Sequence, residues 1–400
     1  MGLTTNYVNS AGVDIGTPLV PKSYVMDLYP ELANTFRFAG LWTWGYNNFG
    51  QLGDNTTAAK SSPVQTVAGG TNWKSVAGGY YHTAAIKTDG TLWTWGYNSY
   101  GQLGDNTVAA KSSPVQTVSA GTNWKQVASG YYHTAAIKTD GTLWSWGFNI
   151  YSQLGDNTTA GKSSPVQTVA GGTNWKSVAS GYYHTAAIKT DGTLWLWGRN
   201  NYGQLGDNTV VQKSSPVQTV AGGTNWNSVA SGYYHTAAIK TDGTLWTWGQ
   251  NSNGQLGDNT LAGKSSPVQT VAGGTNWKSV TRGQYHTAAI KTDGTLWLWG
   301  YNNYGQLGDN TIANKSSPVQ TVAGGTNWKS VAGGSAHTAA IKTDGTLWTW
   351  GRNLYGQLGD NSITHRSSPV QTVAGGTNWK LVACGQYHTA AIRDDSMDDM

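Results

Sequence analysis

The chain has 400 residues, among them 54 Gly, 21 Trp and 21 Tyr but only four Phe and one Cys. Charged residues make up 11% of the chain and the formal net charge is +5, so the polar character comes from Gly, Ser, Thr and Asn, which favour turns. This composition excludes a helical bundle, a coiled coil and a disordered chain. The single cysteine, Cys384, excludes an internal disulfide and a cysteine-based zinc site.

The first residues, MGLTTNYVNS, lack the charged and apolar regions of a signal peptide. No apolar run in the chain approaches the roughly 18 residues that a membrane helix needs. The sequence therefore predicts a soluble protein without a signal peptide and without membrane insertion.

Residues 1–40 precede a set of repeats and form an N-terminal extension. Within it, Ser23 to Phe36 mixes apolar residues with Pro30 and favours one or two short helical turns. The extension is too short to fold as a domain, so it is interpreted either as a strap over the rest of the chain or as a segment that docks onto other structural proteins. The candidate docking residues are Tyr24, Met26, Leu28, Tyr29, Leu32 and Phe36.

Residues 41–397 consist of seven repeats of 51 residues without an insertion, and residues 398–400 follow as an acidic end. Each repeat contains Leu-Trp-x-Trp-Gly, first at residues 41–45, and a third Trp, first at Trp73, so that three Trp per repeat account for all 21. Four runs per repeat have strand character, in the first repeat residues 41–45, 63–67, 73–77 and 82–88. Asp89-Gly90 is typical of a hairpin turn between two such strands.

Four short strands in a period of about 50 residues are typical of a propeller blade. An open solenoid is the structural alternative, but it needs polar caps, and the last repeat keeps its apolar residues. The sequence predicts an all-β, seven-bladed β-propeller with four-stranded blades, closed by residues 41–67 and 379–393 in one blade. Trp42 and Trp44 stand two residues apart and so share a strand face, which we expect to pack against the neighbouring blade.

The repeat carries a family resemblance. Trp44-Gly45-Tyr46-Asn47 and Gly50-Gln51-Leu52-Gly53, followed by Pro63-Val64, Val76-Ala77 and Gly79-x-x-His82-Thr83, resemble the repeat of the regulator of chromosome condensation family over residues 41–393. The resemblance implies a seven-bladed propeller with the Gly-x-x-His loops at one mouth of a central shaft. A weaker resemblance is to bacteriophage structural proteins that carry such repeats.

Two activities that the resemblance implies are not expected here. The family's nucleotide exchange factor uses an inserted β-wedge, for which an unbroken 51-residue period leaves no room. The family's light receptor uses Gly-Trp-Arg-His-Thr loops, whereas Tyr80-Tyr81 stands at the matching position.

The repeats also offer little for catalysis. Apart from Asp394 near the end, their carboxylates are Asp in two register positions, first Asp54 and Asp89, and they contain no Glu. Such copies share one environment, whereas acid–base catalysis needs carboxylates whose environments differ. Seven His recur in register from His82 to His388. A ring of metal ligands is one interpretation, but we expect each His to bond the backbone of its own blade. The sequence predicts no enzyme activity, no catalytic residue, no cofactor and no metal site.

Variation between the repeats concentrates in loops, where binding residues usually lie; drift at unconstrained positions is the alternative. The pair before each His is Tyr-Tyr in four repeats, and it changes to Gln284-Tyr285, Ser335-Ala336 and Gln386-Tyr387 in the last three. By the resemblance these Tyr ring one face, interrupted at Ser335-Ala336, and Arg199 and Arg352 stand at another variable loop position. The candidate binding residues are Tyr80, Tyr81, Tyr131, Tyr132, Tyr182, Tyr183, Tyr233, Tyr234, Tyr285, Tyr387, Arg199 and Arg352.

The lysines Lys60, Lys74 and Lys87 recur in every repeat or nearly so and form rings, interpreted as solvated faces, rather than the one-sided stripe of a nucleic-acid footprint. Nucleic acid is therefore not an expected partner. The hypothesis is a non-enzymatic interaction propeller in a virion, such as a tail, fibre or capsid-associated component. It docks on other structural proteins through residues 1–40 and displays its loops to a cell-surface glycan or protein receptor. The alternative is a cytoplasmic or other cellular scaffold in the manner of chromatin and GTPase regulators.

Overall fold

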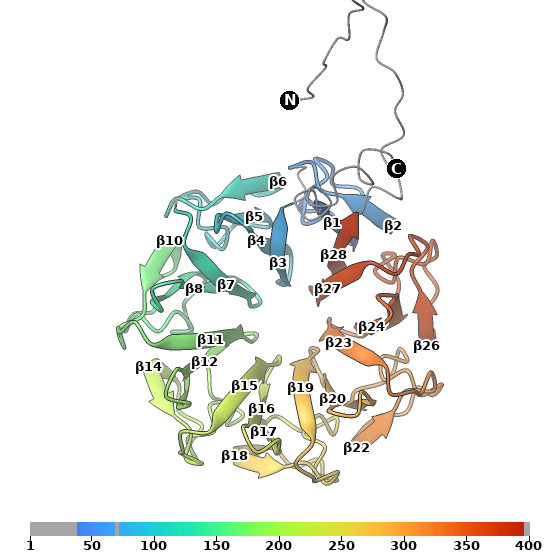
Figure 1. Cartoon of the computed structure of the whole chain (residues 1–400). Coiled ribbons are helices and arrows are strands. Elements are labelled where there is room, and N and C mark those ends of the chain that lie inside the picture. Colours follow the sequence, from blue (N-terminus) through green and yellow to red (C-terminus); the bar gives the residue numbers. More distant parts are fainter. Residues whose placement is uncertain (1–37, 69–71, 120, 396–400) are drawn as a thin grey trace, which may run out of the picture.

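The computed structural model describes residues 38–68, 72–119 and 121–395. They form seven four-stranded antiparallel sheets arranged as blades around a central shaft (Figure 1). The predicted seven-bladed propeller is confirmed. The six expected docking residues of the extension lie outside the described residues.

Each blade contains four strands that follow one another from the shaft outwards. The innermost strands are β3 (Trp73–Gly78), β7 (Trp124–Ser129), β11 (Trp175–Ser180), β15 (Trp226–Ser231), β19 (Trp277–Arg282), β23 (Trp328–Gly333) and β27 (Trp379–Cys384). The second strands are β4 (His82–Lys87), β8 (His133–Lys138), β12 (His184–Lys189), β16 (His235–Lys240), β20 (His286–Lys291), β24 (His337–Lys342) and β28 (His388–Asp395).

The third strands carry the Leu-Trp-x-Trp-Gly motif: β1 (Phe38–Gly45), β5 (Leu92–Gly96), β9 (Leu143–Gly147), β13 (Leu194–Gly198), β17 (Leu245–Gly249), β21 (Leu296–Gly300) and β25 (Leu347–Gly351). The outermost strands are β2 (Lys60–Gln65), β6 (Lys111–Gln116), β10 (Lys162–Gln167), β14 (Lys213–Gln218), β18 (Lys264–Gln269), β22 (Lys315–Gln320) and β26 (Arg366–Gln371). The outermost strand thus begins three residues before the predicted Pro63, because Lys60 pairs with Gly45. The described residues include no helix able to span a membrane.

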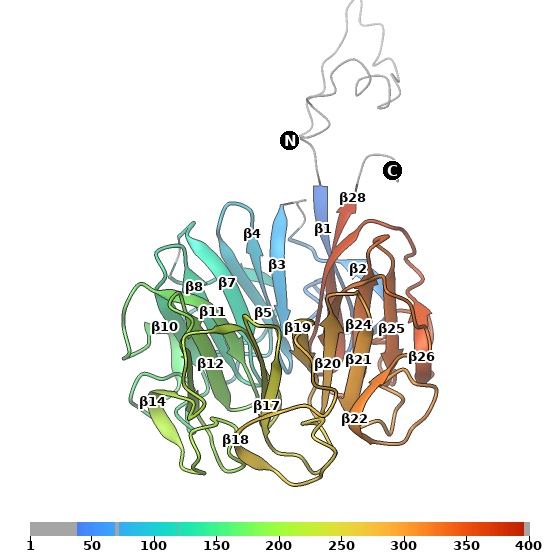
Figure 2. The same ribbon diagram turned by 60° about the horizontal axis from the view of Figure 1, so that its bottom comes forward.

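The ring closes as predicted, by a blade that combines both ends of the described chain. Its strand order is β2-β1-β28-β27, so two strands come from each end. β1 and β28 pair over eight residues, from Phe38 opposite Asp395 to Gly45 opposite His388. The propeller therefore begins at Phe38, three residues before the expected start of the repeats. β1 begins and β28 ends on the same face of the propeller (Figure 2).

The core lies between the blades, and Trp side chains form much of it. Trp44 is fully buried, and its Nε1 donates a hydrogen bond of 2.9 Å to the backbone oxygen of Gln357 in the neighbouring blade. Gly359 allows this contact, because its φ is +66° and a Cβ there would lie 2.8 Å from Trp44 Nε1. Trp42 packs on the same cluster but is only partly buried. The expectation that both Trp face the neighbouring blade is confirmed.

The seven register histidines bond across the blade boundaries. His82 Nε2 lies 3.0 Å from Thr134 Oγ1 of the next blade, and Thr134 Oγ1 donates to the backbone oxygen of Gln102 at 2.8 Å. Trp146 Nε1 donates to that same oxygen at 2.9 Å. Because the threonine hydroxyl has one hydrogen and gives it to Gln102, the hydrogen between His82 and Thr134 belongs to the imidazole Nε2.

The same arrangement recurs at every blade boundary and closes around the ring; we call it the histidine belt. Its pairs are His82–Thr134, His133–Thr185, His184–Thr236, His235–Thr287, His286–Thr338, His337–Thr389 and His388–Thr83. The expectation that each His bonds the backbone of its own blade was wrong. Each imidazole ring packs against the glycine three residues before it, as His82 packs against Gly79. Its Nε2 points toward the next blade.

The histidine belt predicts the effect of removing one hydroxyl. Thr134→Val is expected to lower the free energy of unfolding by about 1–3 kcal/mol, because it leaves the buried Nε2–H of His82 without an acceptor. Thr134→Ser keeps the hydroxyl and serves as the control. Urea unfolding measures both variants; a valine variant as stable as the serine variant would show that the belt contributes nothing.

The belt also predicts acid sensitivity. Burial lowers the pKa of His82, His133, His235, His286, His337 and His388 from 6.5 to about 3, and it lowers the pKa of His184 as well. Between those pH values the unfolded chain binds protons that the folded chain does not. The contribution to stability is therefore complete above pH 6.5 and falls with decreasing pH, by about 1.4 kcal/mol per pH unit for each histidine.

Urea titrations at pH 7, 6 and 5 measure this loss in a range where carboxylates remain ionised. We expect the unfolding midpoint to fall steeply below pH 6.5. A midpoint that stays constant down to pH 5 would contradict neutral, buried histidines.

Candidate binding site: the tyrosine face

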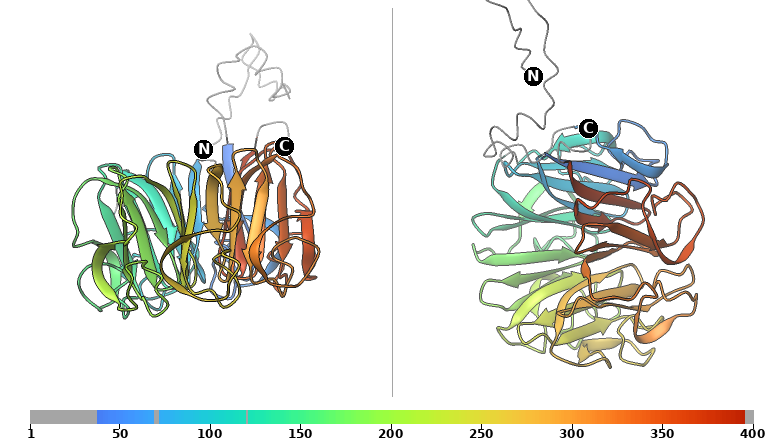
Figure 3. Two further views of the ribbon diagram at one scale, coloured as in Figure 1. Left: turned by 90° about the horizontal axis from the view of Figure 1, so that it is seen from below. Right: turned by 45° about the vertical axis from the view of Figure 1, so that its right-hand side comes forward.

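The loops that join the innermost strand of each blade to its second strand lie together at one mouth of the shaft. In the first loop, Gly79 N donates to His82 O at 2.8 Å, and Tyr80 N donates to Gly130 O of the next blade at 3.3 Å. The longer loops between the third and outermost strands, such as residues 46–59, leave from the same end, because Gly45 pairs with both His388 and Lys60. We call the surface made by these two sets of loops the tyrosine face. It lies opposite the face on which β1 begins and β28 ends (Figure 3).

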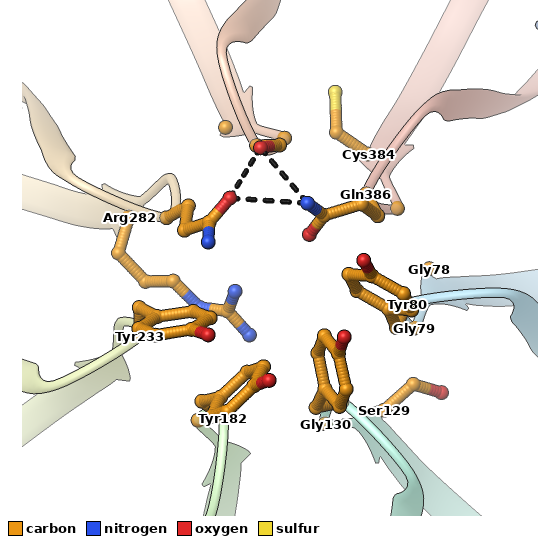
Figure 4. Close-up of a pocket in the computed structure, with 17 residues that line it drawn as sticks. Gly78, Gly79, Tyr80, Ser129, Gly130, Tyr182, Tyr233, Arg282, Cys384 and Gln386 are labelled. Carbon is orange, nitrogen blue, oxygen red and sulfur yellow. Dashed lines mark hydrogen bonds between the residues drawn. The ribbon is translucent and has the colours of Figure 1, made fainter. Parts of the chain in front are cut away.

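An inner ring of seven side chains surrounds the shaft at this mouth (Figure 4). Four of them are tyrosines whose ring centroids lie 3.6, 3.8 and 3.6 Å apart in succession: Tyr80, Tyr131, Tyr182 and Tyr233. The other three are Gln284, Ser335 and Gln386. Gln386 Nε2 donates to Gln284 Oε1 and to Ser335 Oγ, each at 3.0 Å, and Ser335 Oγ donates to Gln284 Oε1. The inner ring is thus aromatic on one side and amide-rich on the other.

The second tyrosine of each loop belongs to a wider aromatic belt. Tyr81 lies 5.4 Å from Tyr46 and 5.0 Å from Phe49 between ring centroids, and Tyr132 lies 4.8 Å from Tyr100. The structure therefore brings all ten expected tyrosines to one face: Tyr80, Tyr81, Tyr131, Tyr132, Tyr182, Tyr183, Tyr233, Tyr234, Tyr285 and Tyr387.

Sequence reasoning missed one register position of this belt. It is occupied by Phe49, Tyr100, Tyr151, Tyr202, Asn253, Tyr304 and Tyr355, and each of the six aromatics contacts other rings of the face. The signal was an aromatic residue in six of seven copies, two positions before Gln-Leu-Gly. Arg282, which lines the shaft below the inner ring, was also missed; it stands where other repeats have Ser, Gly or Cys.

Each of the two expected arginines connects rings of the two blades that flank its own blade. The guanidinium carbon of Arg199 lies 4.8 Å from the Tyr151 centroid and 4.9 Å from that of Tyr234, and its Nη1 donates to Tyr234 Oη at 3.0 Å. Arg352 lies 5.2 Å from the Tyr304 ring and 5.1 Å from the Tyr387 ring. Arg352 thus spans the place where Ala336 interrupts the belt.

A hollow of about 340 Å³ opens at this interruption. Ser335 and Ala336 are both buried and line it at the position where four other blades carry two tyrosines. The remaining lining comes from Tyr80, Asn253, Gln284, Tyr285, Tyr301, Tyr304, Arg352, Gln386 and Tyr387. The hollow combines aromatic rings, amides and one guanidinium, and none of these described residues is acidic.

The ring hydroxyls are neutral donors at physiological pH. Burial is the first cause that raises the pKa of Tyr80, Tyr131 and Tyr233 above 10, and it raises the pKa of Tyr132 to about 12. The tyrosine face can therefore donate hydrogen bonds through its phenols and attract anions through its arginines.

Two of the three lysine rings form ion pairs or cation–π contacts, contrary to the expectation that they are solvated faces. Lys60 Nζ lies 3.6 Å from Asp54 Oδ2, and five further blades repeat this pair with lysine and one with arginine. Lys87 Nζ lies 4.9 Å from the Trp73 ring and 4.8 Å from the Trp93 ring.

The aspartates of the repeats hold turns. Asp54 accepts a hydrogen bond from Thr56 N at 3.1 Å, and Asp89 accepts one from Thr91 N at 2.9 Å. Among the described residues, no group of His, Cys, Asp or Glu is placed to hold a metal ion.

The fold and this face define a propeller whose loops gather at one mouth of the shaft, and the chain matches family models of that class. Residues 115–397 match the RCC1-like domain, and residues 40–86 and 89–137 match the regulator of chromosome condensation (RCC1) repeat. The chain belongs to the RCC1-like family of β-propellers.

Named proteins with similar sequences or structures agree with this family assignment. The chain is 34% identical to the ultraviolet-B receptor UVR8 of Arabidopsis thaliana over 334 residues, which are 82% of this chain and 76% of the receptor. It is 30% identical to human E3 ubiquitin-protein ligase HERC2 over 88% of this chain but only 8% of the ligase. Yeast RCC1 (Prp20), crystallised with Kap60, has the same fold with a TM-score of 0.81 and 20% identity over 91% of each chain.

The aromatic contacts of Arg199 predict a measurable stability effect. Arg199→Gln, which introduces the residue found at Gln250, is expected to lower the free energy of unfolding by about 0.5–2 kcal/mol through loss of the cation–π contacts. Lys176→Asn removes an exposed charge and introduces the residue found at Asn227, so it serves as the control. Chemical unfolding measures the free energy of unfolding of both variants. Equal values would show that Arg199 does not stabilise the aromatic belt.

Proposed function

We propose that this protein is a non-enzymatic interaction propeller of a cell, which binds a protein partner through the tyrosine face. The observation that carries the proposal is the aromatic belt, which Arg199 and Arg352 bridge and which a hollow interrupts at Ser335 and Ala336. Tyr and Arg are enriched in protein interfaces and in their energetic hot spots, because they contribute large contact areas and hydrogen bonds at modest entropic cost.

Exposed aliphatic residues at the rim of the same face support a protein partner. Val108, Val210, Leu261, Ile312 and Ile363 occupy one register position in the loops between third and outermost strands, and each is between 59% and 66% exposed. Their identities differ from blade to blade while the strands beneath them barely change. A partner that contacts several blades would therefore meet an apolar rim around an aromatic centre.

The hollow at Ser335 and Ala336 gives this surface an orientation. In a seven-fold ring of identical loops a partner could bind in several equivalent registers, whereas one hollow selects a single register. An aromatic or amide side chain of the partner fits its lining of tyrosines and glutamines, and Arg352 would favour a carboxylate nearby.

The N-terminal extension is proposed as a second attachment point. β1 begins at Phe38 on the face opposite the tyrosine face. A partner held by Tyr24, Met26, Leu28, Tyr29, Leu32 and Phe36 would therefore leave the tyrosine face free, and the protein could connect two partners.

The named relatives favour the cellular alternative over a virion component. A plant receptor, a human ubiquitin ligase and a yeast RCC1 are all cellular proteins, and neither the expected virion role nor a glycan receptor has support among them. The interaction role rests on the family and on the tyrosine face, while the choice of partner is assigned to the loops that differ between the repeats of this chain.

The test fills the hollow with the residues of the other blades. Ser335→Tyr/Ala336→Tyr restores the Tyr-Tyr pair of four repeats, and we expect it to reduce partner binding at least tenfold without loss of fold. Tyr131→Ser/Tyr132→Ala makes the reverse change elsewhere on the face and serves as the matched control. Partners are captured from cells of the source organism by full-length protein and quantified by mass spectrometry for each variant.

The expected result is a small set of proteins that the wild-type chain retains and the filled variant loses, with a smaller loss in the control. Arg352→Gln, which introduces the amide that the repeat of Gln250 carries at this position, tests the hollow without added bulk. Identical protein sets for wild type, filled variant and Arg352→Gln would rule out the hollow as the binding site. Capture dominated by nucleosomes that falls steeply with salt would instead indicate a nucleic-acid partner.

A further inference from the structure

The central shaft is lined almost entirely by small uncharged residues. It encloses about 280 Å³, and its lining comes from the last residues of the seven innermost strands. Six of the seven residues at the ends of these strands are small: Gly78, Ser129, Ser180, Ser231, Gly333 and Cys384. The seventh is Arg282, whose side chain is the one charged side chain among the described residues of the lining.

The guanidinium of Arg282 reaches across the shaft instead of packing within its own blade. Its Nη2 donates to the backbone oxygen of Ser180, two blades away, at a distance of 2.6 Å. The side chain points toward the centre of the inner ring (Figure 4). A guanidinium has five N–H donors, so this contact leaves most of its hydrogen-bonding capacity directed into the shaft.

No described residue neutralises this charge. Arg282 takes part in none of the ion pairs of the described chain, and neither the shaft nor the inner ring contains a carboxylate among its described residues. The aromatic contacts that hold Arg199 and Arg352 have no counterpart among the contacts found for Arg282. Arg282 is partly buried in the shaft, and charges removed from bulk water in proteins are usually paired.

The inner ring narrows the shaft on the tyrosine face. Beside Arg282 the space between the inner-ring tyrosines and the Gln284–Ser335–Gln386 cluster has a volume of only about 30 Å³. Below that constriction the shaft widens to about 280 Å³, which is enough for a small hydrated anion. Arg282 lines both spaces and so stands at the narrowed end of a polar chamber.

We propose that the shaft is a binding site for a small oxyanion, held by the guanidinium of Arg282 at the constriction below the inner ring. A guanidinium binds phosphate and carboxylate groups through paired N–H donors. Ser129, Ser180 and Ser231 lie on the same lining and supply further polar groups. The site differs from the partner site in its central residue, because Arg282 lines the shaft and the inner ring but not the hollow proposed to bind the partner.

The field of Arg282 agrees with this position. Its positive charge contributes to the lowered pKa of His133, His184, His235 and His286, which belong to four successive blades. An anion beside the guanidinium would offset this field at the centre of the ring.

Isothermal titration calorimetry of the full-length protein with inorganic phosphate tests the proposal, at pH 7.5 and constant ionic strength. A parallel titration with malonate distinguishes a tetrahedral oxyanion from a carboxylate. We expect saturable one-site binding of at least one of the two anions. Arg282→Ser introduces the residue of Ser129, Ser180 and Ser231, so the variant is expected to fold, and its binding should be at least tenfold weaker.

Lys176→Asn is the control, because it removes one positive charge from an innermost strand and should leave the affinity unchanged. The proposal is overturned if neither anion binds the wild-type protein saturably, or if Arg282→Ser binds as tightly as wild type. Equal weakening in both variants would likewise overturn it, since general charge rather than the guanidinium would then account for binding. Circular dichroism of Arg282→Ser confirms that its fold is retained.

Discussion

A histidine of one blade donates to a threonine of the next, and that threonine donates to a backbone oxygen that also accepts a tryptophan N–H. This arrangement, as in His82, Thr134, Gln102 and Trp146, links the two blades at each boundary through three buried hydrogen bonds. Each blade supplies the histidine and the carbonyl on one side and the threonine and tryptophan on the other. The seven links form a closed circuit that includes the blade shared by both chain ends, so no blade boundary is left unpaired.

This circuit explains why the repeats are so uniform and where they are free to differ. A histidine and its threonine partner stand 52 positions apart in six of the seven pairs, so an insertion within a repeat would have to leave both partners in place. The positions of the inner ring and of the aromatic belt on the tyrosine face carry no such constraint. They can be Tyr, Gln, Ser or Arg while the backbone beneath them stays the same. Two features are proposed to bind ligands: the hollow at Ser335 and Ala336, and the cation Arg282. Both are departures from the repeat, and the scaffold that carries them is held together by the histidine belt.

The fold could be predicted from the sequence because its signals are repeated seven times. The period, the Asp89-Gly90 turn and the four strand-like runs led to the propeller, and the identity of the end strands led to the shared closing blade. Partners of individual side chains were harder to infer. The histidines were expected to bond within their own blade, because periodicity says nothing about which neighbour a side chain reaches. Lys60 and Lys87 looked solvated because Asp54 and Trp93 approach them only in the folded chain.

The candidate site was predictable in part for the same reason. The Tyr-Tyr pairs formed a visible pattern, and the resemblance placed them at one mouth of the shaft. The ring that contains Phe49 and Tyr100 was overlooked, although its aromatic character recurs in six repeats. Arg282 stood out only once the strand that bears it was seen to end in the shaft, since one arginine among variable small residues resembles drift.

The tautomeric state of the register histidines tests the central claim most directly. Nitrogen-15 NMR of histidine-labelled protein at pH 5.5 resolves neutral Nε2–H, neutral Nδ1–H and doubly protonated imidazole rings. The histidine belt predicts seven neutral rings with the hydrogen on Nε2, because each of the seven threonine partners donates its hydroxyl hydrogen to a backbone oxygen. The exposed His365 serves as an internal reference. Protonated rings at that pH, or hydrogens on Nδ1, would contradict the belt and with it this explanation of how the ring is closed.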